Sequence, residues 1–563
     1  MKKVLIAFMA AAAFCSCAKN ELPGDGTTPW NGGDEAYLNI RISDASALTK
    51  APGDETVSGD FKYGTEHDVI SAKFYFYDGN GHYVAEANVW NGGTATEKDQ
   101  NIEFNGNSVV VLRGLTEKTF PKYVVTLLNA PAGFQPAVTL EDMEKVLAGG
   151  FSRKEDGNNY FIMSTTSFAG QTDAEGKALP YFVTEVKEEN FANEPVAAEI
   201  AKPVVIYVER LAAKVTLGVS SSLAATENGL YKLNVTVSGD LNDEGGSVVG
   251  GNGESVEIGA TDIYVKFLGW GLNATAKDSY MMKNISESWT DGELGFAWND
   301  AANFRSYWGM SYNYGNADYA STLEYRSANM LNNVIGGVEY CSENTTTAEY
   351  AGNRDAVTGV ILKAEICDAD GNPLEDLVRY NGILYTADSF LKYVLGYTEG
   401  LPYYKEEVEG SVKYTRIGAE HVELVAGEDG CVYVQMKGEG LPLLFADNNG
   451  ETEITDFTAI NDSLKAFEEN HGKANGYKDG LMYYNIPVQH FRPLGEEVLE
   501  ANYGIVRNHL YSITVNSLTK IGKGIYNPDE NIVPDKDDEK ESYYVGAQIN
   551  ILSWKIVNQG VDL

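Results

Sequence analysis

Apolar and polar residues alternate along many short stretches of this chain, a pattern typical of β-strands with one buried face. Residues 36–43 show it most clearly, because Leu38, Ile40 and Ile42 point one way and the residues between them point the other. This stretch is predicted to be a half-buried strand. Residues 73–77 and 82–84 flank turn residues 78–81 and predict a β-hairpin. A longer strand run covers residues 204–219.

Helical periodicity is confined to three stretches. Residues 139–148 predict a helix with Thr139 as its N-cap, Asp142 in the capping-box position and Gly149 ending it. Residues 456–470 place Phe457, Ile460, Leu464 and Phe467 on one helical face, and residues 387–395 predict a shorter helix. Many short strands with few scattered helices predict a mostly β fold built from β-sandwich domains.

The C-terminal part of the sequence is unusual. Residues 527–541 are acidic and almost devoid of apolar side chains, so they read as a linker that spans about 50 Å when extended. A strand pattern over residues 543–563 follows. Its apolar face shifts partway, which predicts a bulge or a passage between two packing environments. The residues of this strand are Val545, Ala547, Ile549, Ile551, Leu552, Trp554 and Ile556. Such a strand must pair with its own subunit or with another.

Residues 1–17 have the organisation of a targeting sequence. A positive start precedes the apolar residues 4–13, which are too few to span a bilayer. Ser16 directly before Cys17 resembles a lipobox, so we expect cleavage there and a lipid on Cys17. Ordinary secretion, with Cys17 merely near the cut, is the alternative. The Gly- and Pro-containing residues 18–35 then predict a flexible tether.

Composition narrows the classes of partner. The chain has 563 residues and a formal charge of −38, and a field of that sign repels nucleic acid and anionic lipid head groups. Beyond the targeting sequence, only Cys341, Cys367 and Cys431 remain. At most one disulfide can form among them, and packing alone explains all three.

No catalytic constellation is recognisable. The six histidines form no zinc motif, and no phosphate-binding loop or nucleophile elbow occurs. Residues 368–372 resemble a calcium loop but fit a simple turn better. The aromatic residues 306–314 fit a sugar-binding platform or, better, core packing. We therefore expect no enzyme activity, no metal and no cofactor.

Several segments together resemble the fimbrillins of Gram-negative anaerobes, in particular the minor-fimbrium (Mfa-type) major subunits of the FimA/Mfa-like family that build type V pili. The segments are residues 208–215 (VERLAAKV), 340–345 (YCSENT), 482–488 (MYYNIPV), 503–511 (YGIVRNHLY), Trp554-Lys555 and the ending Val561-Asp562-Leu563. The resemblance implies two β-sandwich-like (transthyretin-like) domains. It also implies travel to the outer membrane as a lipid-carrying (palmitate) lipoprotein.

Maturation follows from the same resemblance. In such subunits a protease with trypsin-like preference cuts after a basic residue beyond the first strand, and Lys50-Ala51 fits that site here. The chain would then divide into a signal peptide (1–17), a propeptide with a removable strand (18–50), an N-terminal β-sandwich (51–208), a C-terminal β-sandwich (209–526), an acidic linker (527–542) and a donor strand (543–563).

The implied mechanism is donor-strand exchange. Leu38, Ile40 and Ile42 would fill a groove in the N-terminal domain until the cut at Lys50 frees their strand. The C-terminal strand of another copy would then occupy the groove, and head-to-tail joining builds a filament. Partners would be further copies, accessory fimbrial subunits, the protease and, before the cut, the outer membrane. A tip or anchor component and a surface glycan-binding lipoprotein are the alternative functions.

Overall fold

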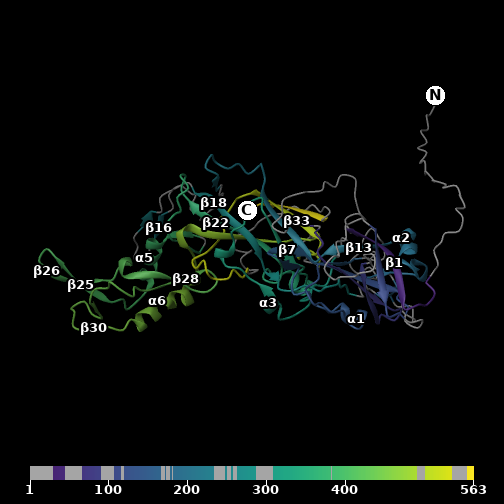
Figure 1. Ribbon diagram of the computed structural model, residues 1–563. Coiled ribbons are helices and arrows are strands. Elements are labelled where there is room, and N and C mark those ends of the chain that lie inside the picture. Colours follow the sequence, from purple (N-terminus) through teal and green to yellow (C-terminus); the bar gives the residue numbers. More distant parts are fainter. Residues whose placement is uncertain are drawn as a thin grey trace, which may run out of the picture.

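The computed structural model (Figure 1) describes residues 30–44, 66, 68–89, 107–115, 120–166, 171–172, 178–179, 182–233, 247–249, 255–257, 263–286, 308–381, 383–490, 501–534 and 555–562. Strands dominate these ranges, which confirms the prediction of a mostly β fold. Within them, no helix combines the length and apolar character that crossing a membrane requires. The strands gather around three principal hydrophobic cores.

The first core lies inside a sheet that closes on itself. Its strand order is β11-β5-β2-β3-β4-β1-β13-β8, and β8 also pairs with β5. The strands are β1 (Glu35–Asp44), β2 (Ala72–Tyr77), β3 (Tyr83–Val89), β4 (Asn107–Arg113), β5 (Tyr123–Leu128), β8 (Met163–Thr165), β11 (Thr184–Glu185), β12 (Phe191–Ala192) beside β1, and β13 (Val204–Arg210). Closure leaves few free strand edges.

The predicted hairpin is confirmed. Strands β2 and β3 pair antiparallel, and the carboxylate of Asp78 accepts hydrogen bonds from the backbone N–H groups of Asn80 and His82. Gly81 adopts a φ of 79°, a conformation that costs glycine little. The local turn chemistry therefore specified this element.

One predicted helix is much shorter than expected. Thr139 does cap it, accepting a hydrogen bond from the Asp142 N–H at 3.1 Å, but α1 covers only Leu140–Met143. The following backbone pairs elsewhere: Ala148 N–H donates to Ser279 O at 2.9 Å, and Met281 N–H donates to Val146 O at 2.8 Å. Tertiary pairing overrides the helical pattern of residues 144–148.

The strand run of residues 204–219 splits at Leu211, whose N–H donates to Ile162 O. Strand β13 stays in the first sheet, while β14 (Ala212–Val219) enters the sheet β21-β14-β33-β35. This sheet and the sheet β15-β18-β22-β32-β34 enclose the second core. Their other strands are β15 (Tyr231–Lys232), β18 (Tyr264–Asn273), β21 (Val338–Ser342), β22 (Gly359–Cys367), β32 (Leu481–Pro487), β33 (His509–Ser517), β34 (Lys523–Gly524) and β35 (Lys555–Asp562).

The third core lies at the end of the molecule opposite β1 (Figure 1). It is covered by α5 (Ala387–Tyr397) and α6 (Thr458–His471), which confirm the two remaining predicted helices. Its strands are β23 (Leu377–Tyr380), β24 (Ile383–Thr386), β25 (Tyr403–Val408), β26 (Ser411–Arg416), β27 (Val422–Ala426), β28 (Cys431–Met436), β29 (Leu444–Phe445), β30 (Glu453–Ile454) and β31 (Ala474–Tyr477). Residues 209–526 thus surround two cores.

Short elements complete the described chain. They are α2 (Pro195–Ile200), α3 (Tyr319–Thr322), α4 (Ala348–Ala351), β6 (Ser152–Glu155), β7 (Asn158–Phe161), β9 (Gln171–Thr172), β10 (Ala178–Leu179), β16 (Ser247–Val249), β17 (Ser255–Glu257), β19 (Thr275–Ala276) and β20 (Leu323–Glu324), with 3-10 turns at Glu188–Asn190, Ala328–Met330, Ala419–His421 and Lys478–Gly480.

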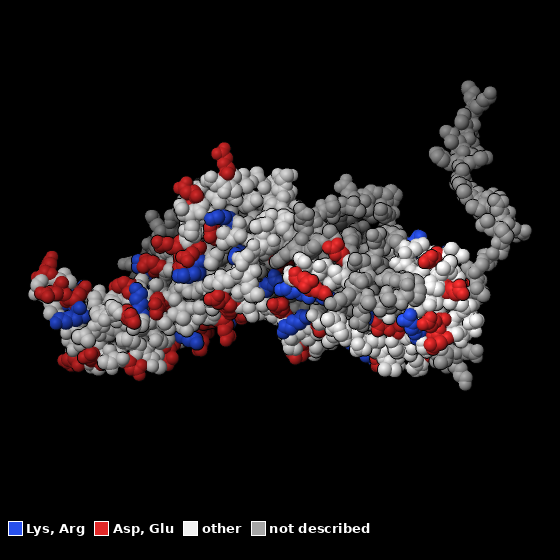
Figure 2. All heavy atoms as spheres, viewed as in Figure 1, with Lys and Arg blue, Asp and Glu red and all other residues white. Residues whose placement is uncertain are grey.

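Figure 2 shows acidic side chains spread over the visible face, with basic ones between them.

Candidate functional site

The first strand, β1, is an internal strand of the closed sheet. It pairs antiparallel with β4, from Glu35–Arg113 to Arg41–Asn107, and parallel with β13, from Ile40–Val204 to Asp44–Val208. Both backbone edges of β1 are therefore hydrogen-bonded over much of its length. Taking β1 away would open a slot between β4 and β13 and leave two rows of backbone groups without partners.

The inner face of β1 is part of the first core. Leu38, Ile40 and Ile42 are each at most 1% exposed and belong to the same cluster as Phe74 and Ile206. The sequence analysis assigned these three side chains to the buried face, and the structure places them there. Burial of each such side chain stabilises the fold by about 1.5–3 kcal/mol.

The outer face of β1 differs from the sequence-based expectation of a half-buried strand. Tyr37 and Asn39 are 6% and 2% exposed, because helix α2 lies over them. Tyr37 clusters with Ala197 and Ala198 of α2. The side-chain amide of Asn39 donates to Ala201 O at 2.8 Å and to Glu199 O at 3.3 Å. The alternation was right, but a helix that the periodicity did not reveal covers the second face.

The connection from β1 to the rest of the fold runs through residues 45–65, which lie outside the described residues together with Lys50 and Ala51. Cys17 also lies outside them. Beyond this segment Glu66 is firmly held. Its carboxylate lies 2.9 Å from Lys214 Nζ and accepts a hydrogen bond from the Tyr340 hydroxyl at 2.9 Å. Its backbone carbonyl accepts from Arg210 Nε at 3.0 Å.

Burial dominates the electrostatics of this anchor. The side chains of Lys214 and Glu66 are 2% and 5% exposed. Desolvation lowers the pKa of Lys214, and the neighbouring carboxylate of Glu66 only partly offsets this effect. The Lys214–Glu66 ion pair therefore fixes the position of Glu66 but adds little to the stability of the fold.

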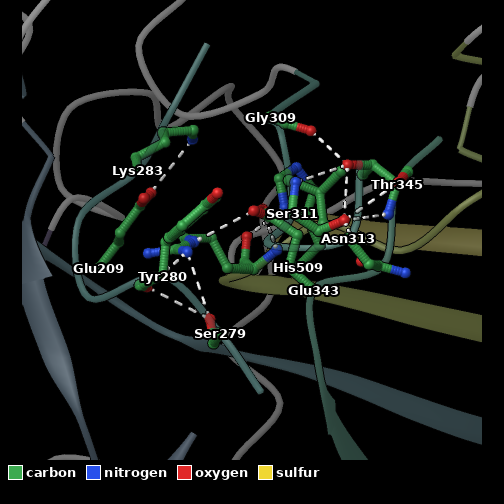
Figure 3. Close-up of polar contacts among 12 residues, drawn as sticks. Glu209, Ser279, Tyr280, Lys283, Gly309, Ser311, Asn313, Glu343, Thr345 and His509 are labelled. Atoms are coloured by element: carbon green, nitrogen blue, oxygen red, sulfur yellow. Dashed lines mark hydrogen bonds and ion pairs between the residues drawn. The ribbon is translucent and has the colours of Figure 1, made fainter. Parts of the chain in front are cut away.

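Two further buried ion pairs lie where the first sheet meets the second core (Figure 3). Lys283 Nζ lies 3.4 Å from Glu209 Oε2, and Arg507 Nε lies 3.4 Å from Glu343 Oε1; all four side chains are fully buried. Arg507 also donates to Ser279 Oγ at 3.3 Å and to Tyr280 O at 2.9 Å. Through residues 279–283, these contacts connect β13 with the start of β33.

The C-terminal strand β35 lies at an edge of its sheet, parallel to β33 from His509–Lys555 onward. Of the residues assigned to a donor strand, Ile556 lies in β35, whereas Val545, Ala547, Ile549, Ile551, Leu552 and Trp554 lie outside the described residues. The predicted shift of the apolar face at residues 552–556 thus adjoins the point where β35 begins pairing with its own subunit.

The other residues that the sequence suggested for ligand binding have structural roles. The Asp368 carboxylate accepts hydrogen bonds from the N–H groups of Asp370 and Asn372, as a turn requires. Trp308 is fully buried, so it packs in the interior and offers no platform to a sugar. In the part of the chain that the structure describes, no group of three or more His, Cys, Asp or Glu side chains could hold a metal ion. Cys341, Cys367 and Cys431 are free thiols.

Comparison with known proteins points to one family. Residues 475–560, which run from β31 into β35, match the family model described as "Major fimbrial subunit protein type IV, Fimbrillin, C-terminal". No curated protein matches the chain.

Solved structures give weaker similarities. A fimbrillin of Porphyromonas gingivalis is 13% identical over 93% of this chain and 96% of its own, with a TM-score of 0.32. A tip fimbrial protein of the same organism is 11% identical over 59% of this chain and 80% of its own, with a TM-score of 0.24. A fimbrial assembly protein of Parabacteroides distasonis is 11% identical over 69% and 97%, with a TM-score of 0.22. Similarities this low do not indicate a function for this chain.

Proposed function

We propose that this chain, whose residues 475–560 match the fimbrillin C-terminal family model, is a structural subunit of the shaft of a cell-surface fimbria and has no enzymatic role. The observation that supports this most is the position of β1, an internal strand whose two faces are buried and whose only covalent link to the following strands is the segment 45–65. That segment contains the proposed protease site after Lys50.

Cleavage there converts an intramolecular strand into a separate piece. The strand then leaves, taking the proposed lipid anchor at Cys17 with it and releasing the subunit from the outer membrane. The emptied slot exposes the apolar side chains around Ile206 and the unpaired backbone of β4 and β13. This state is costly, so the slot accepts a replacement strand.

The replacement is the C-terminal strand of another copy, with Val545, Ala547, Ile549 and Ile551 supplying the apolar face. A strand added in trans contributes backbone hydrogen bonds and several buried aliphatic side chains of about 1.5–3 kcal/mol each. Each subunit offers one slot and one strand, so the contact repeats head to tail and builds an open filament. Such filaments at the cell surface serve adhesion.

The test begins with the purified precursor of residues 18–563, treated with a trypsin-like protease and run unboiled on a denaturing gel. We expect a ladder of oligomers and a new N-terminus at Ala51. Lys50→Gln should remove the new N-terminus at Ala51, and together with Lys62→Gln, the other basic residue within residues 45–65, it should abolish the ladder; Lys62→Gln alone should retain it. Deleting residues 544–563 should leave monomer only.

Because that deletion also removes β35, a second variant, Ile549→Asp with Ile551→Asp, alters the apolar face of the donor strand and leaves the residues of β35 unchanged. Monomer in every lane, with cleavage complete, contradicts the shaft-subunit function. A subunit that is cut and accepts a strand without donating one would be a tip component. Binding in a glycan screen without any polymer would favour the surface glycan-binding lipoprotein.

A further inference from the structure

Resting on the proposed function, we infer that Asn39 marks the register of the slot and that Asn550 of a second copy takes its place there. The slot between β4 and β13 is largely apolar, and apolar alternation alone permits strands to shift by two residues. A buried polar group with fixed partners distinguishes one register from the others. Asn39 is such a group, at 2% exposure.

The partners of Asn39 belong to the end of α2. Its amide group donates to the carbonyls of Glu199 and Ala201, at the C-terminal end of this short helix, where carbonyls have no partner within the helix itself. When β1 departs, both carbonyls lose this donor. A replacement strand that carries an amide at the same position restores both hydrogen bonds.

The C-terminal segment contains a stretch similar to the sequence around Asn39, identical at three of five positions. Residues 36–40 read Ala-Tyr-Leu-Asn-Ile, and residues 547–551 read Ala-Gln-Ile-Asn-Ile. In the shared register Ala547, Ile549 and Ile551 take the inward positions of β1, and Asn550 falls at the carbonyls of α2. The third position exchanges leucine for isoleucine, which conserves volume.

A shift by two residues fits less well. It would place Ala547 at the position of Leu38, leaving a cavity, and Val545 at the position of Ala36, which is fully buried. It would also place the longer Gln548 at the carbonyls of α2. The proposed register has two mismatches at buried positions: Gln548 at the position of Tyr37, beside α2, and Ser553 at the position of Ile42, towards the end of β1. The amide position and three core positions therefore favour the proposed register.

The first test compares variants in the full chain after cleavage. Asn550→Ala should shorten the lifetime of preformed oligomers by about tenfold or more, and Asn550→Asp at least as much, because a carboxylate would face two carbonyls. Gln548→Ala is the matched control and should change the lifetime less than about twofold. The opposite order, or equal effects of the two alanine variants, overturns the inferred register while leaving the ladder, and thus the proposed function, intact.

The second test reads the register directly with cysteine pairs. Tyr37 lies opposite Val111 and Asn39 opposite Val109 on β4. The proposed register therefore predicts a disulfide between Gln548→Cys and Val111→Cys, whereas the two-residue shift predicts one between Gln548→Cys and Val109→Cys. The uncleaved precursor, whose slot is filled by β1, should form neither.

The outcomes separate the two proposals. A Q548C–V111C link between subunits supports both the register and the filament. The same link within one subunit supports the register and overturns head-to-tail exchange. Preference for V109C, or oligomers without either link, overturns the register alone.

Discussion

At the residue scale, two buried ion pairs lie between the first sheet and the second core. Glu209 and Lys283 are both fully buried, and Lys283 also lies over the ring of Phe182, 5.7 Å from its centroid. Two ions removed from water gain little net stability from each other, but either one left alone is strongly unfavourable. Substitution of either Glu209 or Lys283 alone is therefore expected to destabilise this junction.

The variant Lys283→Met tests this. It should lower the free energy of unfolding by about 3–5 kcal/mol, because Glu209 would remain buried without its cation. Urea denaturation followed by tryptophan fluorescence measures the change. Adding Glu209→Gln should recover most of the loss, and Lys277→Met at an exposed lysine serves as the control. If Lys277→Met is as costly as Lys283→Met, the junction has no special role.

A second residue-scale prediction concerns pH. Although burial opposes ionisation of Asp376, hydrogen bonds from Lys478 Nζ, Asp479 N–H and the Tyr526 hydroxyl hold its pKa below the ordinary 3.8. A carboxyl with a depressed folded-state pKa stabilises fully above the unfolded pKa and loses that contribution as pH falls through the folded value.

Asp376→Asn should therefore cost about 1 kcal/mol at pH 7, after allowance for solvent screening, and progressively less below pH 3.8. Unfolding in urea at a series of pH values measures the difference from wild type. Asp388→Asn, in the exposed pair with Lys392, is the control. A difference that stays constant from pH 7 to pH 2 contradicts the assignment.

At the scale of elements, β1 and β35 are opposites. Strand β1 is internal, paired on both sides and covered on both faces, whereas β35 lies at the edge of its sheet, next to β33 alone among the described strands. Strand β1, which is proposed to leave, is thus embedded in its sheet. The segment proposed to replace it directly precedes β35, which lies at the edge of another sheet. Exchange requires the cut to come first.

The variant Ile40→Ala is expected to affect the stability of the precursor but not that of the polymer. It should destabilise the precursor by about 2–5 kcal/mol because it opens a cavity in the first core. After cleavage the altered strand is gone, so polymers should dissociate at the wild-type rate. Ile206→Ala, in the wall of the slot, should weaken both states. Thermal melting and oligomer lifetimes are the measurements. Polymers weakened by Ile40→Ala would show that β1 remains in place.

At the scale of the whole molecule, the net charge of the chain affects how fast two copies approach one another. Residues 1–50 contain five basic and five acidic side chains, so the cleaved chain keeps the full charge of −38. Figure 2 shows acidic groups along the visible length of the molecule. In the proposed assembly, copies that join head to tail approach one another against this repulsion, and the proposed joint is apolar.

Assembly of cleaved subunits should therefore accelerate several-fold between about 10 mM and 150 mM salt, as the screening length falls from about 30 Å to about 8 Å. Light scattering after protease addition measures the rate. Dissociation of finished polymers should respond little to salt, because buried side chains and backbone hydrogen bonds hold them. Slower assembly at higher salt would indicate oppositely charged docking surfaces instead.

The sequence by itself determined those features that depend on neighbouring residues. Alternation placed Leu38, Ile40 and Ile42 on one face, turn chemistry at Asp78 specified the hairpin, and 3.6-residue periodicity gave α5 and α6. The period of a pattern and its end signals are local, so they can be read without the fold.

Only the tertiary structure decided what covers each face and where each edge pairs. It ended α1 after one turn, closed the first sheet through β5 and β8, divided residues 209–526 between two cores and laid α2 over Tyr37 and Asn39. These outcomes depend on contacts between residues as far apart as Asn39 and Ala201. Alternation shows that a strand has two faces, but whether the polar one meets water or a helix is decided by a distant part of the chain.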